Sequence, residues 1–412
     1  MEVENLLLFL CGFLISAAAV YRYTRSFIIP GVTIMMFLGA VSVFIPVVNN
    51  ELDKIFNFTE NKLPDLILLV FLPILIFESG RKLKLREIKN EIIPIAFFAV
   101  VGVIATILIV AICISTFLHT SLMDGVLFGS IIASTDAVAV ASIFKRFTGP
   151  HRLNLIIEGE SLFNDATSLV AFNVIVGIMF SNETFSFVGT SLSFLWSMLG
   201  AVALGSVLGY VGGKILNKWQ GDELVNFTFS VALAVGGFLI ADHFLYISGV
   251  VTTLFTALIL IRTHKDIFTE VRAAFHKYWD YTGFMTNSFL FFLIGIPLVY
   301  EFHTYAGVPM IVILLAPITI VMISRAITVY GGCMVLRLAK IRIPHQWQNI
   351  LTLGGLRGGI SVAMVLSLPV DYQYKTLFIA SVISVVVINL VILPIVLDSY
   401  LKKSKTVDER TN

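Results

Sequence analysis

The sequence predicts an all-α polytopic membrane protein with thirteen transmembrane helices, on three observations. Apolar residues make up 58% of its 412 residues and charged residues only 13%, and the mean hydropathy is +0.94. Apolar stretches of about 20 residues, the length that spans a bilayer, recur from end to end. Basic residues gather in alternate loops between them, as short cytoplasmic loops require. This composition excludes a soluble domain, and no nucleic-acid partner is expected.

The apolar stretches define the spans and their direction. We expect spans at about 6–22, 27–48, 63–80, 92–118, 122–144, 153–180, 185–213, 225–241, 244–262, 279–300, 306–336, 347–370 and 375–399. One set of alternate loops holds nearly all Lys and Arg residues. The other set holds only Lys54, Lys62 and Lys375, while Arg325 and Arg357 lie inside spans. The N-terminus is therefore expected outside and the C-terminus in the cytoplasm, with the protein in the cell membrane.

The chain is expected to form one transmembrane domain over residues 1–400, followed by a short cytoplasmic tail over 401–412. Between the ninth and tenth spans, residues 266–279 place apolar side chains on one helical face. A connecting helix in the inner membrane interface is the expected structure there.

Span six carries the most costly polar groups of the chain. Its stretch Glu158-Gly-Glu160-Ser161-Leu-Phe-Asn164-Asp165 places Asp165 roughly 18 Å deep. Ionisable groups at that depth mark ion or proton pathways. Ser161 and Asp165 share one helical face, whereas Glu160 and Asn164 share another about 100° away. One face offers a hydroxyl and a carboxylate to a cation, and the other offers a carboxylate that needs a partner.

Spans five and twelve are predicted to break near the membrane midplane. Asp136 interrupts span five, and Gly354-Gly355-Leu-Arg357-Gly358-Gly359 interrupts span twelve. The two spans cross in opposite directions, so they predict inverted repeats with two crossing discontinuous helices around the site. Asp136 is expected to offset the positive half-helix ends and Arg357 the negative ones.

Two further charged groups lie in or near spans. Arg325 is in span eleven without a local acidic neighbour, and a buried arginine needs a partner. Glu160 is the expected partner, which leaves Asp165 to exchange ligands. Glu78 lies near the end of span three, three residues before Arg81. Its position alone is equally consistent with a cation ligand and with a side chain that reaches the interface.

These residues resemble the monovalent cation/proton antiporter-1 family, the sodium/proton exchangers of prokaryotic type. Glu160-Ser161-Leu-Phe-Asn164-Asp165 is similar to the family's Glu-Ser-x-x-Asn-Asp site, and Gly354-Gly355-Leu-Arg357-Gly358 to its Gly-Gly-Leu-Arg-Gly signature. Thr135-Asp136 resembles its Thr/Ser-Asp-Pro break, although Ala137 stands here in place of the proline. The resemblance covers nearly the whole chain.

The resemblance implies a homodimer with an ion-carrying core, at about 92–180 and 306–399, and a scaffold formed by the remaining spans. It also implies elevator-type alternating access. In this reading, Asp165 binds either a cation or a proton, and Glu160 pairs with Arg325 as a structural bridge. The other residues implied at the cation and proton site are Ser161, Glu78, Thr135, Asn164 and Asp136.

The expected function is antiport of sodium or another monovalent cation against protons. Asn164 stands where electrogenic relatives carry a second Asp, so the resemblance implies electroneutral one-to-one exchange. Because cation and proton compete for Asp165, activity is expected to vary with pH near neutrality. No resident cofactor is expected.

Two other classes of function remain as alternatives. One is a gated cation channel or a sodium-coupled solute carrier of the same architecture. The other is an intramembrane hydrolase that uses Asp136 and Asp165 as paired acids. The sequence has neither a His-Glu-x-x-His site nor a nucleophile elbow, so no enzyme is expected.

Overall fold

The structure, a computed structural model, describes residues 2–24, 29–45, 62–136, 150–180, 187–219, 222–263, 269–304 and 310–408. Every regular element in these ranges is a helix, which confirms the predicted all-α class. Some predicted features lie outside the described residues, namely Ala137, the second half of span five at 137–144, and residues 409–412 of the tail.

The helices, with η marking π-helical segments, are α1 (Glu2–Tyr23), α2 (Gly31–Ser42), α4 (Lys62–Leu66), η2 (Ile67–Phe71), α5 (Leu72–Gly80), α6 (Leu85–Asn90), α7 (Ile92–Ala96), η3 (Phe97–Gly102), α8 (Val103–Leu118), α9 (Leu122–Ala133), α11 (His151–Phe180), α12 (Phe187–Lys218), α13 (Glu223–Leu239), η4 (Ile240–Phe244), α14 (Gly249–Thr263), α15 (Thr269–Thr304), α16 (Met310–Leu338), α17 (His345–Leu353), α18 (Gly359–Leu366) and α19 (Lys375–Asp408).

The contacts between residues divide the chain into two compact units. The first unit comprises residues 1–64, 94–164 and 288–412, and the second comprises residues 65–93 and 165–287. The division into an ion-carrying core at about 92–180 and 306–399 and a surrounding scaffold remains a prediction. Each unit is described by itself below.

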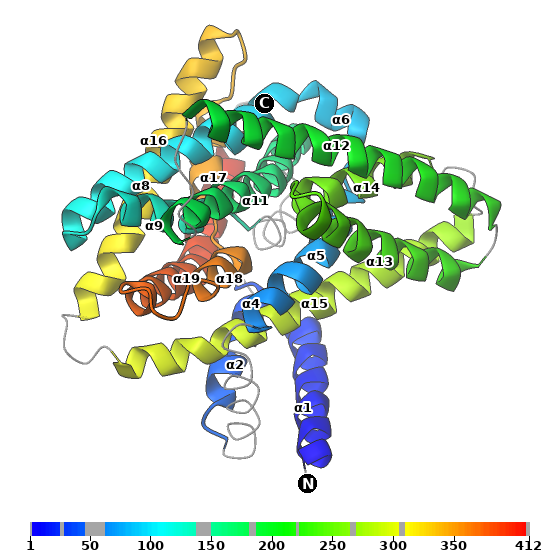
Figure 1. Ribbon diagram of the computed structural model, residues 1–412, viewed down its shortest axis with the longest axis horizontal. Coiled ribbons are helices and arrows are strands. Elements are labelled where there is room, and N and C mark those ends of the chain that lie inside the picture. The colour runs from blue at the N-terminus through cyan, green and yellow to red at the C-terminus, as the bar shows by residue number, and fades with distance from the viewer. Residues whose placement is uncertain are drawn as a thin grey trace. The chain divides into compact units, whose positions relative to one another are not determined.

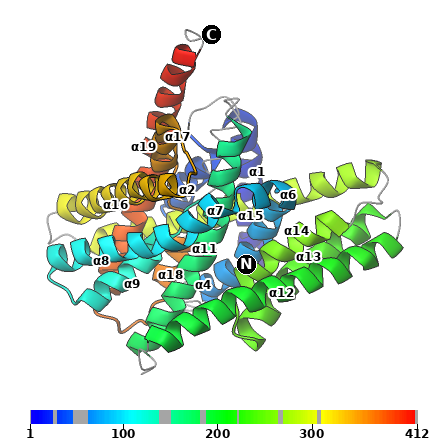
Figure 2. The same ribbon diagram turned by 90° about the horizontal axis from the view of Figure 1, so that it is seen from above.

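In the first unit, α8 and α9 form a closely packed helix pair (Figures 1 and 2). His119 ends α8 in the left-handed conformation at φ 55°, and Ser121 then begins α9 through a reciprocal capping box with Asp124. Gly125 of α9 faces the backbone of Ala111, where a Cβ atom would lie 2.5 Å from the carbonyl oxygen. The turn chemistry and this close approach together bring the start of α9 against α8.

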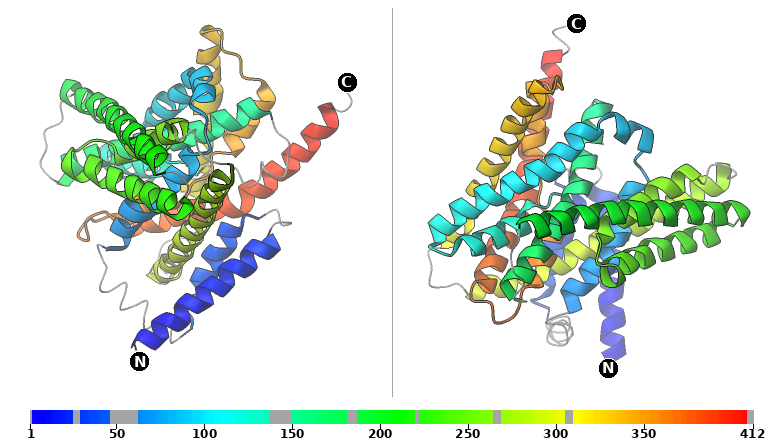
Figure 3. Two further views of the ribbon diagram at one scale, coloured as in Figure 1. Left: turned by 90° about the vertical axis from the view of Figure 1, so that its right-hand side faces the viewer. Right: turned by 45° about the horizontal axis from the view of Figure 1, so that its top comes forward.

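The N-terminal helix α1, dark blue in Figure 3, lies beside α2 in the same unit. The Phe13 ring of α1 packs edge-on against Phe292 of α15, with ring centroids 5.6 Å apart. In α2, the buried Thr33 hydroxyl donates a hydrogen bond to the carbonyl of Leu390 in α19 at 3.1 Å. Helices from both ends of the sequence therefore share one core.

The second unit is built around α12, α13, α14 and α5, with α14 packed against the other three. Trp279 of α15 is fully buried there, and its indole N–H donates to the hydroxyl of Ser230 at 2.9 Å. Its ring stacks on Phe77 of α5 with centroids 4.5 Å apart. This aromatic pair fixes the end of α5 that carries Glu78.

Eight helical stretches of the described residues are long and apolar enough to cross a membrane, and four shorter apolar helices accompany them. Each of these helices overlaps a predicted span, while the number thirteen remains a prediction. One predicted boundary is wrong. Residues 269–279 are not a separate connecting helix but the first turns of α15, because no Gly or Pro stands near the expected junction at residue 279 to end a helix. Likewise, α19 continues to Asp408, so residues 401–408 of the predicted tail are helical.

Candidate ion-exchange site

The end of one helix and the break between two others meet in the first unit. Helix α9 ends at Ala133, and the chain continues as extended backbone from Ser134, where ψ is 141°. The glycine-rich segment 354–358 separates α17 from α18, as the glycines predict. The amide of Asp136 donates to the carbonyl of Leu356 at 2.7 Å, so the chain after α9 is hydrogen-bonded to the segment between α17 and α18.

Arg357 binds the carbonyl end of α9. Its side chain is only 1% exposed, and Nη1 donates to the carbonyls of Ala133 and Ser134 at 2.5 and 2.9 Å. The last carbonyls of a helix have no partner inside the helix and carry partial negative charge, so a guanidinium there satisfies both needs.

Asp136 lies at the opposite kind of helix end. A Cβ atom on Gly358, the residue before α18, would lie 2.6 Å from Oδ2 of Asp136. The carboxylate therefore lies beside the positive N-terminus of α18, and only glycine leaves space for it. The structure thus pairs one charge with each kind of half-helix end.

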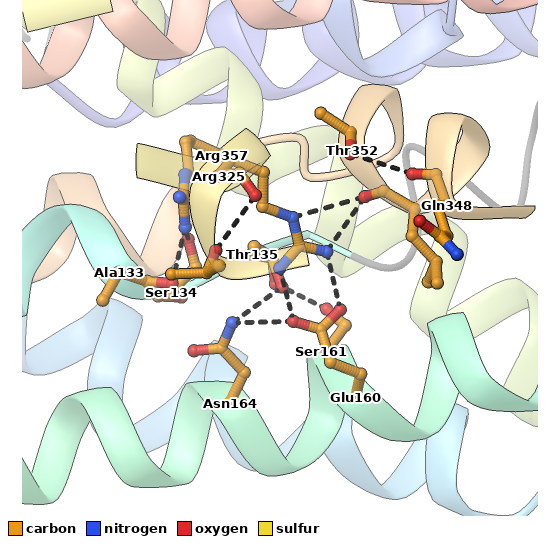
Figure 4. A network of polar contacts seen from close by, with 12 residues as sticks. Ala133, Ser134, Thr135, Glu160, Ser161, Asn164, Arg325, Gln348, Thr352 and Arg357 are labelled. Atoms are coloured by element: carbon orange, nitrogen blue, oxygen red, sulfur yellow. Dashed lines mark hydrogen bonds and ion pairs between the residues drawn. The ribbon is translucent and has the colours of Figure 1, made fainter. Parts of the chain in front are cut away.

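Glu160 and Arg325 form a buried ion pair (Figure 4). Arg325 Nη1 donates to Glu160 Oε1 at 2.8 Å, and Nη2 donates to Oε2 at 3.1 Å. The same guanidinium donates through Nε and Nη2 to the carbonyl of Leu351, near the C-terminal end of α17, at 3.3 and 3.1 Å. Arg325 lies against Gly355, where a Cβ atom would come within 2.6 Å of Nε.

Asn164 connects this ion pair to the chain that follows α9. Its amide nitrogen donates to Glu160 Oε1 at 3.3 Å and to the Thr135 hydroxyl at 3.1 Å. Ser161 in turn donates its hydroxyl hydrogen to the Thr135 carbonyl at 2.6 Å. All four side chains are at most 3% exposed. Figure 4 shows Thr135 between α11 and the two arginines.

Among the residues that the structure describes, this geometry leaves two oxygen atoms with unused acceptor capacity. A carbonyl oxygen has two lone pairs, and the Thr135 carbonyl accepts one hydrogen bond from Ser161. The Ser161 hydroxyl oxygen, which acts as the donor in that bond, keeps its own acceptor sites. Two buried neutral oxygens 2.6 Å apart suit a hard monovalent cation, which prefers oxygen ligands.

Two predicted site residues belong to the second unit. Asp165 is buried, with 8% of the residue exposed. The Glu78 side chain is also buried and forms an ion pair with Lys82, while Arg81 lies 3.6 Å away. Glu78 therefore has basic partners from the segment that follows it.

Sequence reasoning missed the backbone partners of both arginines. These partners are the backbone carbonyls of Leu351, Ala133 and Ser134, and a backbone carbonyl cannot be singled out from the sequence. The only available signal was the cluster of glycines beside Arg357, because glycines allow a backbone to approach another group closely. Asn164 was predicted at the ion site, but its link between Glu160 and Thr135 was not.

Apolar helices of spanning length, a break between α17 and α18 that contacts the chain after α9, and buried ionisable groups at this contact define an integral membrane transport protein. More specifically, the chain belongs to the transmembrane sodium/hydrogen exchanger family, whose match covers residues 7–403. The resemblance noted in the sequence is thereby confirmed, and the chain is that of a multi-pass transporter and not an enzyme.

Several relatives carry antiporter names. The chain is 30% identical over 353 residues to the Na(+)/H(+) antiporter ApNhaP of Aphanothece halophytica, covering 85% of this chain and 67% of that protein. It is 31% identical over 365 residues to the Na(+)/H(+) antiporter NhaP of Pseudomonas aeruginosa, covering 85% and 84%. The match to the Na(+)/H(+) antiporter NhaG of Bacillus atrophaeus is 29% identical and spans only 62% of that protein.

The fold is also that of a solved structure. The sodium proton antiporter MjNhaP1 from Methanocaldococcus jannaschii at pH 8 superposes with a TM-score of 0.80. The superposition covers 98% of this chain and 99% of that chain, at 17% sequence identity. At this identity, the likeness establishes a common fold.

Proposed function

We propose that the protein exchanges sodium, or another monovalent cation, for protons across the cell membrane. The carrying observation is the oxygen pair of Ser161 and Thr135, near the point where the chain after α9 meets the segment between α17 and α18, in a chain of the sodium/hydrogen exchanger family. The antiporter names of the three relatives described above support it.

Asp165 is the proposed carrier, bound in turn by a cation and by a proton. It follows the buried segment that carries Ser161 and Asn164, and it is itself buried. Ser161, Thr135 and Glu78 supply further oxygens to the cation. Competition for one carboxylate makes the exchange obligatory, because neither ion has a site while the other occupies it.

The proposed stoichiometry is one proton per cation. Both carboxylate oxygens of Glu160 are engaged by Arg325, so Glu160 has a fixed partner and is not the proposed carrier. Asn164 carries no charge and uses its amide to hold Glu160 and Thr135. Asp165 is then the single exchanging carboxylate, and the exchange moves no net charge.

Alternating access, dimer formation and orientation complete the proposal. The site moves between the two membrane faces in an elevator-type step within a homodimer, and it works at a rate that varies with pH. The N-terminus lies outside and the C-terminus in the cytoplasm, which the distribution of Lys and Arg supports.

The test measures cation-driven proton movement in everted vesicles by the dequenching of a pH-sensitive dye. Wild-type protein is expected to respond to sodium, with potassium and lithium tested beside it at several pH values. Asp165→Asn is expected to abolish the response, while Asp371→Asn, which neutralises an exposed loop carboxylate, retains it. A full response from Asp165→Asn contradicts the carrier assignment, and a sustained current in planar bilayers favours a channel.

A further inference from the structure

A cluster of charged and titratable side chains lies at the C-terminal end of α5 in the second unit. It is formed by Glu78, Arg81 and Lys82 together with His276 and Asp280 of α15. The Lys82 ammonium forms an ion pair with Glu78 Oε1 and lies 3.6 Å from Asp280 Oδ1. Arg81 Nη2 lies 2.5 Å from Asp280 Oδ1 and 3.6 Å from Glu78 Oε1. Two basic side chains therefore share two carboxylates, and the Lys82 ammonium is the direct partner of Glu78.

Helix α15 holds Arg81 to one side of Glu78. Besides Asp280, it offers His276, whose Nδ1 lies 2.7 Å from Arg81 Nη1 and whose carbonyl accepts from Nη2 at 3.3 Å. A guanidinium only donates hydrogen bonds, so Nδ1 is the acceptor in this contact. The Arg81 side chain is 2% exposed, and these three contacts direct its charge towards α15.

Glu78 and Lys82 differ in their freedom to move. The Glu78 side chain is 9% exposed and packs on Gly283, where a Cβ atom would lie 2.5 Å from Cγ. The Lys82 side chain is 43% exposed on a long flexible stem. The ammonium can thus leave for water, whereas the carboxylate stays in place.

We propose that Lys82 competes with the transported cation for Glu78, and that Asp280 and His276 keep Arg81 from doing the same. The inference rests on the proposed function, in which Glu78 is a cation ligand. An ammonium and a sodium ion each neutralise one carboxylate charge, so the cation binds Glu78 only when Lys82 moves into water. Lys82 then sets the apparent cation affinity without touching the cation.

The test compares the sodium concentration that gives half-maximal dequenching in vesicles. Lys82→Gln is expected to lower it roughly two- to fivefold, the range that a partly exposed ion pair allows. Lys82→Arg keeps the competing charge and is expected to stay near wild type. Asp280→Asn is expected to raise the half-maximal sodium concentration, because Arg81 and Lys82 would then both pair with Glu78. His276→Phe releases Arg81 by a second route and is expected to raise it too, should Asp280→Asn fail to fold.

Lys84→Gln is the matched control. It removes one positive charge from the same segment, but the Lys84 side chain is 73% exposed and pairs with Glu87 at 2.9 Å. It is expected to leave the half-maximal concentration unchanged. The inference is overturned if Lys82→Gln shifts this concentration no more than Lys84→Gln does, or if releasing Arg81 lowers it. Failure of the proposed function looks different, since the wild type and Lys84→Gln would then both show no cation-driven proton movement.

Discussion

Arg325 holds Glu160 by two hydrogen bonds, Nη1 to Oε1 at 2.8 Å and Nη2 to Oε2 at 3.1 Å. Two further donors of the guanidinium, on Nε and Nη2, reach the Leu351 carbonyl near the end of α17. Three helices, α11, α16 and α17, are joined by one side chain. A bidentate pair of this kind has a fixed geometry as well as a favourable charge interaction.

Arg325→Ala is expected to destabilise the protein by about 3–5 kcal/mol, because it leaves Glu160 buried and unpaired. Folded yield and the midpoint of thermal unfolding in detergent measure the loss. Arg325→Lys, which keeps one charge but not the two-pronged contact, is expected to recover part of it. If Arg325→Ala were normally stable yet inactive in transport, Arg325 would act directly in ion exchange.

Gly358→Ala is expected to reduce transport. A Cβ atom at residue 358 would lie only 2.6 Å from the Asp136 side chain, too close for both groups to keep their positions. An overpacked site of this kind costs about 1–3 kcal/mol. Dequenching activity and unfolding midpoint are both expected to fall. Gly331→Ala is the control, since a Cβ atom there has nothing within 4 Å in the part of the chain that the structure describes. Equal behaviour of the two variants would contradict the close approach.

Thr33→Val is expected to lower the free energy of unfolding by about 1–2 kcal/mol. Pro394 in α19 has no N–H, so the Leu390 carbonyl loses its donor within the helix, and the Thr33 hydroxyl replaces it at 3.1 Å. Valine has nearly the same shape but no donor. Thr33→Ser keeps the hydroxyl and serves as the control in thermal unfolding. The assignment fails if Val is tolerated as well as Ser.

The helical class and the interruption of span twelve could be predicted because both leave strong marks in the sequence. A run of glycines around Arg357 cannot sustain a helix, and α17 and α18 are separated there. The contact between Arg325 and Glu160 could be predicted for a different reason. A guanidinium in a span requires a carboxylate, and few carboxylates lie at a comparable depth.

Other parts of the site could not be predicted, because they depend on backbone atoms or on distant loops. The carbonyl of Leu351 looks like any other in the sequence, and only the folded chain places it beside Arg325. The hydrogen bond between Tyr372 and Asp124, outside the site, could not be predicted either, because the two residues are 248 positions apart and share no motif. The extent of α15 was missed because a charged interfacial stretch and a span can continue as one helix.

Tyr372 lies in the loop between α18 and α19 and donates its hydroxyl hydrogen to Asp124 Oδ1 at 2.7 Å. Asp124 also accepts from the amide and hydroxyl of Ser121, so the bond ties this loop to the first turn of α9. Burial raises the pKa of Tyr372 above its ordinary value, and the hydrogen bond to Asp124 adds to the shift. The folded protein thus holds this proton more tightly than the unfolded chain does.

A raised tyrosine pKa stabilises the fold fully below about pH 10, the ordinary value, and the contribution is lost as pH rises above it. Tyr372→Phe is therefore expected to be less stable than wild type by about 1–2 kcal/mol at neutral pH. Above pH 10 the difference in stability between wild type and Tyr372→Phe should become smaller, because only the wild type has this hydroxyl proton to lose. Thermal unfolding between pH 7 and pH 11 measures both effects. Tyr374→Phe is the control, because its ring packs against Tyr372 and Phe378 while its hydroxyl makes no hydrogen bond within the described residues. A gap that stayed constant with pH would show that Tyr372 contributes through packing alone.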